Sequence, residues 1–565
     1  MVAYITPKHF DDRLNTVQIQ IAKDALATES RLAAVVNQLG VRTEEDAFDL
    51  LAQTLGLALV DLAKTEIPDR ILDSFPVKMI HRFGVFPVGY QRDGSLLVAT
   101  CNPFNLHPVD AISAATGRPT LPVVALPLEL ARVIKANLGV GAETIDGLLA
   151  QNEEDGVEVL DEMDYDAGGD AAMAQEASVV RLVNDILTEA VESGTSDIHI
   201  EAQESGMKIR YRIDGVLQTQ PMPPEINRFQ SAIVSRLKIM ARLNIAEKRV
   251  PQDGRIKIRV ADRPIDIRLS IIPMLHGEGI VMRILDKERM NFTLRGIGMD
   301  EDIYRTFGEL IKQPHGIILV TGPTGSGKTT TLYSALNEIK DDATKIITTE
   351  DPIEYQLDGI NQIQVHAKVG LTFAASLRAI LRHDPDVVLV GEIRDFETAE
   401  NAIQASLTGH LVFSTLHTND AAGAYTRMVD MGVEPFLVST TVEGIMAQRL
   451  IRKLCPECRK AVHPLRGDLP DDFPWDDLQT QGGEIYQANG CNSCRGTGYS
   501  GRAAIYELLV PSEEVRQLAG TKSPSAEIKR AARAAGMQTL RENGWRKVLA
   551  GLTSIDEVVR TAKKD

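Results

Sequence analysis

The sequence contains no long apolar run, and this absence limits how the chain can meet a membrane. None of its stretches reaches the roughly 20 consecutive apolar residues that a helix needs to cross a bilayer. The N-terminal segment MVAYITPKHFDDRLNTVQIQ also lacks the apolar centre of a secretion signal. We therefore expect a cytoplasmic protein that reaches a membrane only through a partner.

Positive charge is scarce relative to negative charge. The 565 residues include 61 lysines and arginines against 78 aspartates and glutamates, which gives a net charge of −17. This balance argues against sequence-independent binding to nucleic acid or to an anionic lipid surface. Apolar content of 44% allows real cores, and the length suggests about three or four domains.

Cysteine is also scarce. Of the 5 cysteines, four form two C-x-x-C pairs, Cys455/Cys458 and Cys491/Cys494, while Cys101 stands alone. In a cytoplasmic chain such pairs are typical of metal ligands rather than disulfides. Four thiolates predict a closed, structural zinc site that would hold an insertion over residues 455–494. Four reduced, free thiols are the alternative.

A glycine-rich stretch carries the strongest motif, G-x-x-x-x-G-K-[ST]. Its residues, with the threonine that follows, are Gly322, Pro323, Thr324, Gly325, Ser326, Gly327, Lys328, Thr329 and Thr330. An apolar run at 317–320 precedes it and a helical pattern follows, which is the context that the motif needs. Backbone N–H groups and a helix N-terminus would surround phosphate, Lys328 would reach the β- and γ-phosphates, and Thr329 would ligate Mg²⁺. The sequence predicts nucleotide binding rather than a chance turn.

Strand-like runs alternate with helical stretches from residue 291 to about 450. The runs lie at 317–320, 345–348, 387–390 and 411–413. This alternation predicts an α/β domain with a mostly parallel sheet. The tail from about 503 to 565 is expected to be helical.

Carboxylates follow two of these predicted strands. Glu392 follows the run 387–390, at the edge where an open α/β sheet binds its ligand, and it can hold Mg²⁺; Asp386 lies at the other end of that strand. Glu350, Asp351 and Glu354 follow the run 345–348 and suit activation of water beside a γ-phosphate. A capped loop is the alternative, and the sequence alone does not choose between Glu350 and Glu354 as the base.

Two histidines flank the last predicted strand. His417 follows the run 411–413 within Ser414–Asp420, and His410 precedes that run. His417 could contact the γ-phosphate or relay its loss. A structural role for each histidine is equally open.

The N-terminal half contains an acidic segment between two further domains. Residues 1 to about 72 show helical spacing, with one helix expected around Leu32–Leu39 and another from Thr43, and short strands are expected at 85–88 and 96–99. We interpret residues 1–150 as a partner-docking domain, with a plain structural domain as the alternative. Residues 151–176 hold ten acidic residues and no basic one, which predicts a flexible linker or, less simply, an acidic docking segment.

Residues 177–290 predict a second α/β unit. A helix begins at Ser178, and the runs 207–213 and 265–271 alternate apolar with polar residues, so that several arginines share one sheet. A solvated basic face is the ordinary explanation. The neighbouring nucleotide domain favours instead a role in sensing or neutralising phosphate.

The motifs GPTGSGKTT, TTEDPIEY, DPDVVLVGEIRD and TGHLVFSTLHTND, with the paired C-x-x-C, resemble the secretion ATPases of type II secretion and type IV pilus assembly. The segment from Asp430 to Leu450 resembles the type II secretion (GspE) branch more closely. The resemblance covers essentially the whole chain and is weakest over 1–150. It implies a motor that energises pseudopilus assembly and protein export, with pilus extension as the alternative.

The resemblance also implies a fold and an assembly. It predicts a RecA-like ATPase core preceded by a smaller PAS-like α/β lobe, an N-terminal α+β docking domain and a zinc-bound insertion, in a homohexamer. The N-terminal domain would dock on a bitopic inner-membrane protein, and the motor would push an inner-membrane platform protein from the cytoplasmic face. ATP, Mg²⁺ and Zn²⁺ are the expected ligands. A helicase-like nucleic-acid motor, disfavoured by charge, and a nucleotide-gated scaffold are the competing hypotheses.

Residue roles follow from the same resemblance. By motif match, Arg268 and Arg283 would contact phosphate, although the segment Leu269–Pro273 departs slightly from the usual pattern. Three further arginines match positions in the active site or at subunit contacts: Arg378, Arg382 and Arg394. Glu354 is the favoured base with Glu350 as its support, and Glu392 matches the acid of the second nucleotide motif.

Overall fold

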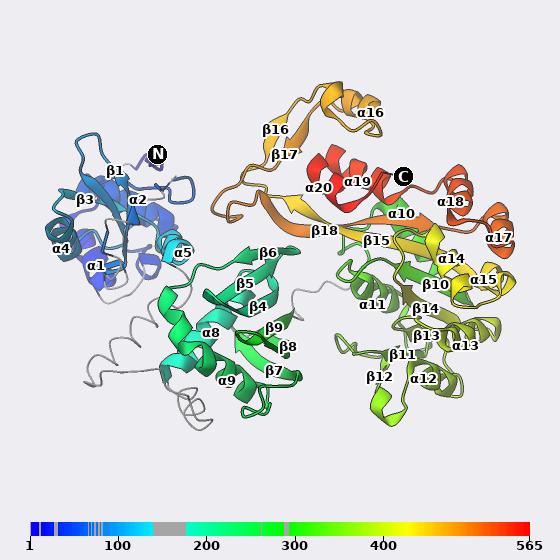
Figure 1. Cartoon of the computed structure of the whole chain (residues 1–565). Helices are drawn as coiled ribbons and strands as arrows, with labels where there is room; N and C mark the ends of the chain where they lie inside the picture. Colours follow the sequence, from blue (N-terminus) through cyan, green and yellow to red (C-terminus); the bar gives the residue numbers. More distant parts are fainter. Residues whose placement is uncertain are drawn as a thin grey trace. The chain divides into compact units, whose positions relative to one another are not determined.

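The computed structural model of the chain describes residues 2–138, 177–286 and 293–564, apart from short gaps (Figure 1). The gaps are residues 11–12, 28–31, 66, 69–70, 73–74, 77–78, 81–82 and 261–262. The predicted acidic linker, 151–176, lies outside the described residues. The chain divides into two compact units, Met1–Ile284 and most of Leu285–Asp565. Within the described part, no helix is long and apolar enough to span a bilayer.

The N-terminal domain combines helices with a three-stranded sheet. Strand β2 lies between β1, which is antiparallel to it, and β3, which is parallel. The elements are α1 (Thr16–Ala27), η1 (Leu32–Ala34), α2 (Glu44–Leu55), β1 (Val85–Tyr90), β2 (Leu96–Thr100), α4 (His107–Thr116), β3 (Thr120–Val124) and α5 (Pro127–Leu138). The predicted start at Thr43 is confirmed, because its side chain accepts a hydrogen bond from the Asp46 N–H and caps α2.

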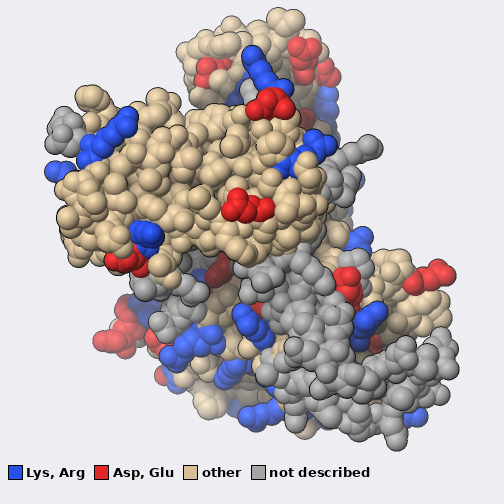
Figure 2. Space-filling model, turned by 90° about the vertical axis from the view of Figure 1, so that its left-hand side faces the viewer, with Lys and Arg blue, Asp and Glu red and all other residues tan. Residues whose placement is uncertain are grey.

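The helix predicted over Leu32–Leu39 is wrong. The chain makes only the short 3₁₀ turn η1 there and then continues as turns that end at Gly40, whose φ is +80°. Leu32 and Leu39 are both buried in one small core, so the helical spacing of apolar residues is satisfied by turns. Figure 2 shows one face of the molecule, on which charged side chains lie singly or in small groups among uncharged ones.

The second domain packs two helices on one face of a six-stranded sheet, in the order β6-β5-β4-β9-β8-β7. Alternate residues such as Ile209 and Tyr211 are buried against the helices, as the alternating pattern predicts. The elements are α8 (Ala177–Glu192), β4 (Thr195–Gln203), β5 (Gly206–Ile213), β6 (Val216–Thr219), η3 (Pro224–Phe229), α9 (Gln230–Met240), β7 (Gln252–Val260), β8 (Arg263–Met274) and β9 (Gly277–Asp286).

The nucleotide domain is built on a seven-stranded sheet in the order β12-β11-β13-β14-β10-β15-β18. All neighbours pair in parallel except β15 and β18, which are antiparallel. The strands are β10 (Gly316–Thr321), β11 (Ile346–Glu350), β12 (Asn361–Gln364), β13 (Val387–Val390), β14 (Leu411–Leu416), β15 (Val442–Leu454) and β18 (Tyr499–Leu509). The four predicted strands and the mostly parallel sheet are therefore confirmed.

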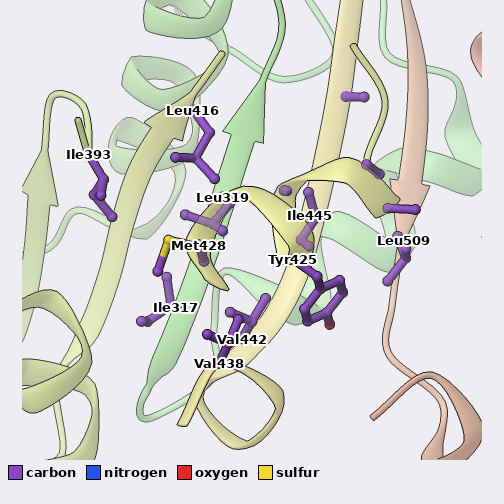
Figure 3. Packing of buried hydrophobic residues seen from close by; sticks show 14 of the residues in the cluster. Ile317, Leu319, Ile393, Leu416, Tyr425, Met428, Val438, Val442, Ile445 and Leu509 are labelled. Atoms are coloured by element: carbon purple, nitrogen blue, oxygen red, sulfur yellow. The ribbon is translucent and has the colours of Figure 1, made fainter. Parts of the chain in front are cut away.

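Helices cover both faces of this sheet, because its central strands are apolar on both sides. Ile317 and Leu319 of β10 pack with α12 to α15 on one face (Figure 3), whereas Ile318 and Val320 pack with α10 and α11 on the other. The helices are α10 (Glu301–Leu310), α11 (Lys328–Ile339), α12 (Phe373–Ile380), α13 (Phe396–Leu407), α14 (Ala422–Asp430) and α15 (Pro435–Thr441). Because the strands are parallel, their carboxyl ends meet at one edge.

The tail differs from its prediction at its beginning. Residues 503–509 belong to strand β18, which pairs with β15, and the helices begin only afterwards. A short apolar run is ambiguous between helix and strand, and here the pairing with β15 decides. The helices that follow are α17 (Glu513–Gly520), α18 (Ser525–Ala534), α19 (Leu540–Leu549) and α20 (Ile555–Thr561).

The insertion between β15 and β18 has little regular structure of its own. Its elements are β16 (Lys460–Val462), η5 (Arg466–Asp468), α16 (Trp475–Thr480) and β17 (Ile485–Gln487), and β16 pairs antiparallel with β17. Phe473 packs edge-on against Trp545 of α19, with 5.3 Å between ring centroids. Asp472 accepts hydrogen bonds from Arg541 and from the Trp545 indole. A few side chains thus join the insertion to the C-terminal helices.

Candidate active site and cysteine cluster

The glycine-rich loop, or phosphate loop (residues 322–327), runs from the end of β10 to the first residue of α11, Lys328. Its glycines are needed for space as well as for conformation. A Cβ on Gly322 would lie 2.6 Å from the Gln448 carbonyl oxygen, and one on Gly327 would lie 2.7 Å from the Gln448 amide nitrogen. Gly325 and Gly327 also have positive φ values of +79° and +92°. Strand β15, which carries Gln448, therefore packs closely against the loop.

Lys328 lies folded over this loop. Its Nζ donates to the Gly322 carbonyl at 2.8 Å and to the Pro323 carbonyl at 3.2 Å. Burial lowers the pKa of the Lys328 ammonium, the nearby Glu392 opposes this shift, and Arg449 adds to it. A cation that is held by loop carbonyls, near a carboxylate, is placed to transfer its hydrogen bonds to a phosphate.

The remaining residues of the loop fit a bound polyphosphate. Ser326 Oγ is buried, and it has no hydrogen-bond partner within the part of the chain that the structure describes. Pro323, Thr324 and Gly325 are exposed at the loop tip, and Thr329 and Thr330 are partly buried in the first turn of α11. An unpaired buried hydroxyl in a glycine-rich loop at a helix N-terminus is suited to an anionic oxygen.

Glu392 and His417 come together just beyond the ends of β13 and β14. The Glu392 carboxylate forms an ion pair with Arg394 through one oxygen, and its other oxygen lies 3.4 Å from His417 Nε2. That second oxygen is buried and has no hydrogen bond from any residue that the structure describes. With Lys328 close enough to influence it, this carboxylate offers a hard oxygen ligand beside the phosphate loop.

Glu350 and Glu354 have different surroundings. Glu350 is 4% exposed and accepts hydrogen bonds on both oxygens, from the Tyr333 hydroxyl on one and from Thr348 (2.6 Å) and Gln362 (3.1 Å) on the other. Glu354 is partly exposed in the loop that follows β11. A carboxylate occupied by three donors is a poor acceptor for a further proton, so the geometry favours Glu354 over Glu350 as a base.

His410 has a local structural contact. Its Nδ1 lies 2.8 Å from the Ala405 carbonyl oxygen and 3.1 Å from Thr408 Oγ1, at the end of α13. Those contacts bind the histidine to the helix C-terminus, away from the strand ends where His417 lies. Of the two histidines, only His417, for which the sequence predicts a catalytic role, lies at the strand ends beside Glu392.

The predicted arginines fall into separate groups. Arg378 of α12 forms an ion pair with Glu397 of α13, and Arg382 donates to the Arg378 carbonyl oxygen at 2.7 Å. Neither pairs with the phosphate loop of its own chain in the described structure. Arg394 forms its ion pair with Glu392, beyond the end of β13. In the other unit, Arg268 lies on β8, and Arg283 on β9 pairs with Asp197 at 3.0 Å.

Sequence reasoning missed three residues at this site: Tyr333, Gln448 and Arg449. Gln448 accepts a hydrogen bond from Thr331 at 2.8 Å, and Arg449 donates to the Asn419 carbonyl oxygen at 3.0 Å. Arg449 therefore joins the phosphate loop, where Gly322 lies against its guanidinium, to the loop that carries His417. In the sequence, the segment containing Gln448 and Arg449 shows only its resemblance to a family, because no local pattern marks it as part of a site.

The four paired cysteines form one cluster. The Sγ atoms of Cys455, Cys458, Cys491 and Cys494 all lie within 4.8 Å of one another, and those of Cys458 and Cys494 are 3.8 Å apart. Tetrahedral zinc with Zn–S bonds of about 2.3 Å requires an edge of about 3.8 Å. Backbone N–H groups of Gly490 and Gly498 point at Cys458 and Cys494, which suits thiolates. The cluster is therefore compatible with a zinc site.

Comparison with known proteins finds relatives over nearly the whole chain. A family model described as "Type II/IV secretion system protein" matches residues 172–560, and a model of the MshEN domain matches residues 55–143. The type II secretion system protein E of Xanthomonas campestris is 44% identical over 94% of this chain and 93% of its own length. The type IV pilus assembly ATPase PilB of Myxococcus xanthus is 40% identical over 98% of each chain. The type II secretion system ATPase E of Vibrio cholerae is 49% identical over 69% of this chain and 76% of its own.

Proposed function

The chain belongs to the type II/IV secretion system protein family, and from this membership we propose that it is the motor ATPase of a type II secretion system. The relatives from Xanthomonas campestris and Vibrio cholerae carry that name, at 44% and 49% identity. The Myxococcus xanthus relative, at 40% identity over 98% of the chain, makes type IV pilus assembly the second candidate. Both candidates require the same chemistry at the same site.

One observation carries the enzymatic part of this proposal. The phosphate loop, the Glu392 carboxylate and His417 come from three neighbouring strands, β10, β13 and β14, and meet at their carboxyl ends. ATP is the substrate that this arrangement fits, because the loop and Lys328 bind the phosphates of a nucleotide. His417, beside Glu392, is placed to contact the terminal phosphate and to relay its loss when that phosphate leaves.

Each charged group has a role in hydrolysis. Glu354 takes the proton of the attacking water, and Glu350 holds the segment in place. Thr329 and Glu392 would hold Mg²⁺, which offsets negative charge on the phosphates. Arg268 and Arg283 add positive charge from the other unit, and the other proposed arginines act in the active site or between subunits: Arg378, Arg382 and Arg394.

The proposal includes an assembly at the cytoplasmic face of the inner membrane. Six copies form a ring, residues 1–150 dock on a bitopic inner-membrane protein, and cycles of lobe closure and opening push a platform protein that extends a pseudopilus. The net charge of −17 supports membrane contact through partners and no role for nucleic acid. The cysteine cluster holds structural zinc, since its four thiols leave no open coordination position.

The experiment that tests the pathway is capture of partners by the full-length chain from a detergent extract of its native membrane. We expect mass spectrometry to identify a bitopic protein with an actin-like cytoplasmic domain and a periplasmic tail. Recovery of pilus-assembly proteins in its place would move the chain to the second candidate and leave the chemistry unchanged. An unrelated tagged cytoplasmic ATPase serves as the background control.

A further inference from the structure

Tyr333 lies in α11 about one and a half turns after Lys328, and its ring is fully buried. Its hydroxyl donates a hydrogen bond to one oxygen of Glu350, the last residue of β11. Burial raises the pKa of Tyr333, and the negative Glu350 raises it further, so the hydroxyl keeps its proton for this bond. The helix that begins at the phosphate loop is thus bound directly to the start of the carboxylate segment, residues 350–357.

The backbone N–H groups of Glu354 and Tyr355 lie near the same hydroxyl, where they oppose the rise in its pKa. Tyr333 therefore lies close to the backbone of the candidate base as well as to Glu350. A side chain that lies against two parts of the carboxylate segment restricts that segment more strongly than a single contact does.

Gln362 on β12 holds the carboxylate segment from the other side. Its amide nitrogen donates to Glu350 at 3.1 Å and to the Tyr355 carbonyl at 3.0 Å, and its amide oxygen accepts from the Leu357 N–H at 2.9 Å. Tyr333 and Gln362 share the Glu350 carboxylate between them. The segment that carries Glu354 is consequently tied both to the phosphate-loop helix and to the edge of the sheet.

We propose that Tyr333 is a positioning residue for hydrolysis, which keeps Glu354 at a fixed distance from the Lys328 end of α11. This inference rests on the proposed function, because it assigns proton removal to Glu354. If the base is displaced by a fraction of an ångström, the rate of hydrolysis falls, while nucleotide binding at the phosphate loop is unaffected. The role therefore predicts a loss in kcat without a loss in affinity.

The test compares the full-length protein with its Tyr333→Phe variant. We expect kcat for ATP to fall by roughly 10- to 100-fold, and KM and the Kd of a fluorescent ATP analogue to stay within about twofold. The matched control is Tyr425→Phe. Tyr425 is also fully buried in this domain (Figure 3), and its hydroxyl has no hydrogen-bond partner in the described part of the chain. Its kcat should equal that of the native protein.

A second variant keeps the test decisive if Tyr333→Phe does not fold. Gln362→Met removes the anchor on β12 and should show the same pattern, a lower kcat at unchanged affinity. If the folded variant of either residue keeps native kcat, or if KM rises as much as kcat falls, the positioning role is overturned. Absence of ATP hydrolysis by the native protein would instead contradict the proposed function, so the two failures are distinguishable.

Discussion

Substitution of Lys328 should change hydrolysis without unfolding the domain, because the described contacts of its ammonium lie within its own loop. Its Nζ bonds only to the Gly322 and Pro323 carbonyls of its own loop, among the residues described. We expect Lys328→Ala to lower ATP turnover at least about 100-fold, since a charge that stabilises the transition state is lost. Phosphate release is the measurement, with thermal unfolding recorded in parallel. Substantial residual turnover would contradict the phosphate-loop assignment.

The matched control for that substitution lies at the other end of the same helix. Lys340 follows α11, is exposed, and donates to the Asp358 carbonyl at 2.8 Å. Lys340→Ala removes the same side chain and the same kind of contact outside the site. Its turnover should match that of the native protein.

The surroundings of Glu557 predict how the free energy of unfolding depends on pH. Burial raises the pKa of its carboxyl, but hydrogen bonds from Arg560 and Arg452 outweigh this and lower the pKa to about 2. A folded pKa below the unfolded value of 4.5 contributes stability above pH 4.5, and this contribution, up to about 3 kcal/mol, is lost as pH falls toward 2. The difference in unfolding free energy between native protein and Glu557→Gln should therefore be largest at pH 7. A difference that stays constant down to pH 3 would refute this coupling.

Elements differ in how far the sequence alone predicts them. The sequence predicts strands β10 and β13 to within one residue, because both contain continuous apolar runs, with a glycine one or two positions after the run. Strands β15 and β18 were not predicted. Gln448 and Arg449 interrupt the apolar pattern of β15. Their polar side chains are explained by their hydrogen bonds beside the phosphate loop, which a local pattern does not reveal.

The candidate site shows the same division between local and distant information. The phosphate loop and the cysteine pairs are contiguous motifs, so spacing alone singles them out. The choice between Glu350 and Glu354 depends on Tyr333 and Gln362, which reach Glu350 from a helix and from another strand. No local pattern encodes that meeting, because it results from the pairing of strands and the packing of α11.

The insertion is the element whose stability we expect to depend most on a ligand. It has only short strands and one short helix, so we propose that a metal bound at the cysteine cluster provides much of its order. We expect native protein to contain about one zinc ion per chain and Cys458→Ser to contain almost none, with faster proteolysis within residues 455–494. Elemental analysis and limited proteolysis measure both effects. Metal-replete native protein without zinc would contradict the assignment.

Cys101 supplies the control for the cluster. It lies in the N-terminal domain, and burial raises its thiol pKa to about 12, so it is a poor metal ligand at neutral pH. Cys101→Ser should keep the zinc content of the native protein. Loss of zinc in this variant would show that the measurement reports general unfolding rather than the cluster.

At the scale of the whole molecule, the proposed hexamer predicts how active and inactive chains influence one another. Native protein is mixed with Lys328→Ala at constant total concentration and allowed to exchange subunits before turnover is measured. If all six sites must act together, a half-and-half mixture retains only about 2% of native activity, whereas independent sites retain about half. We expect a fall much steeper than the native fraction, because a motor that pushes one platform needs coordinated closure of its lobes. A linear fall would contradict coordination, and mixtures with Lys340→Ala, which keeps its site, should lose nothing.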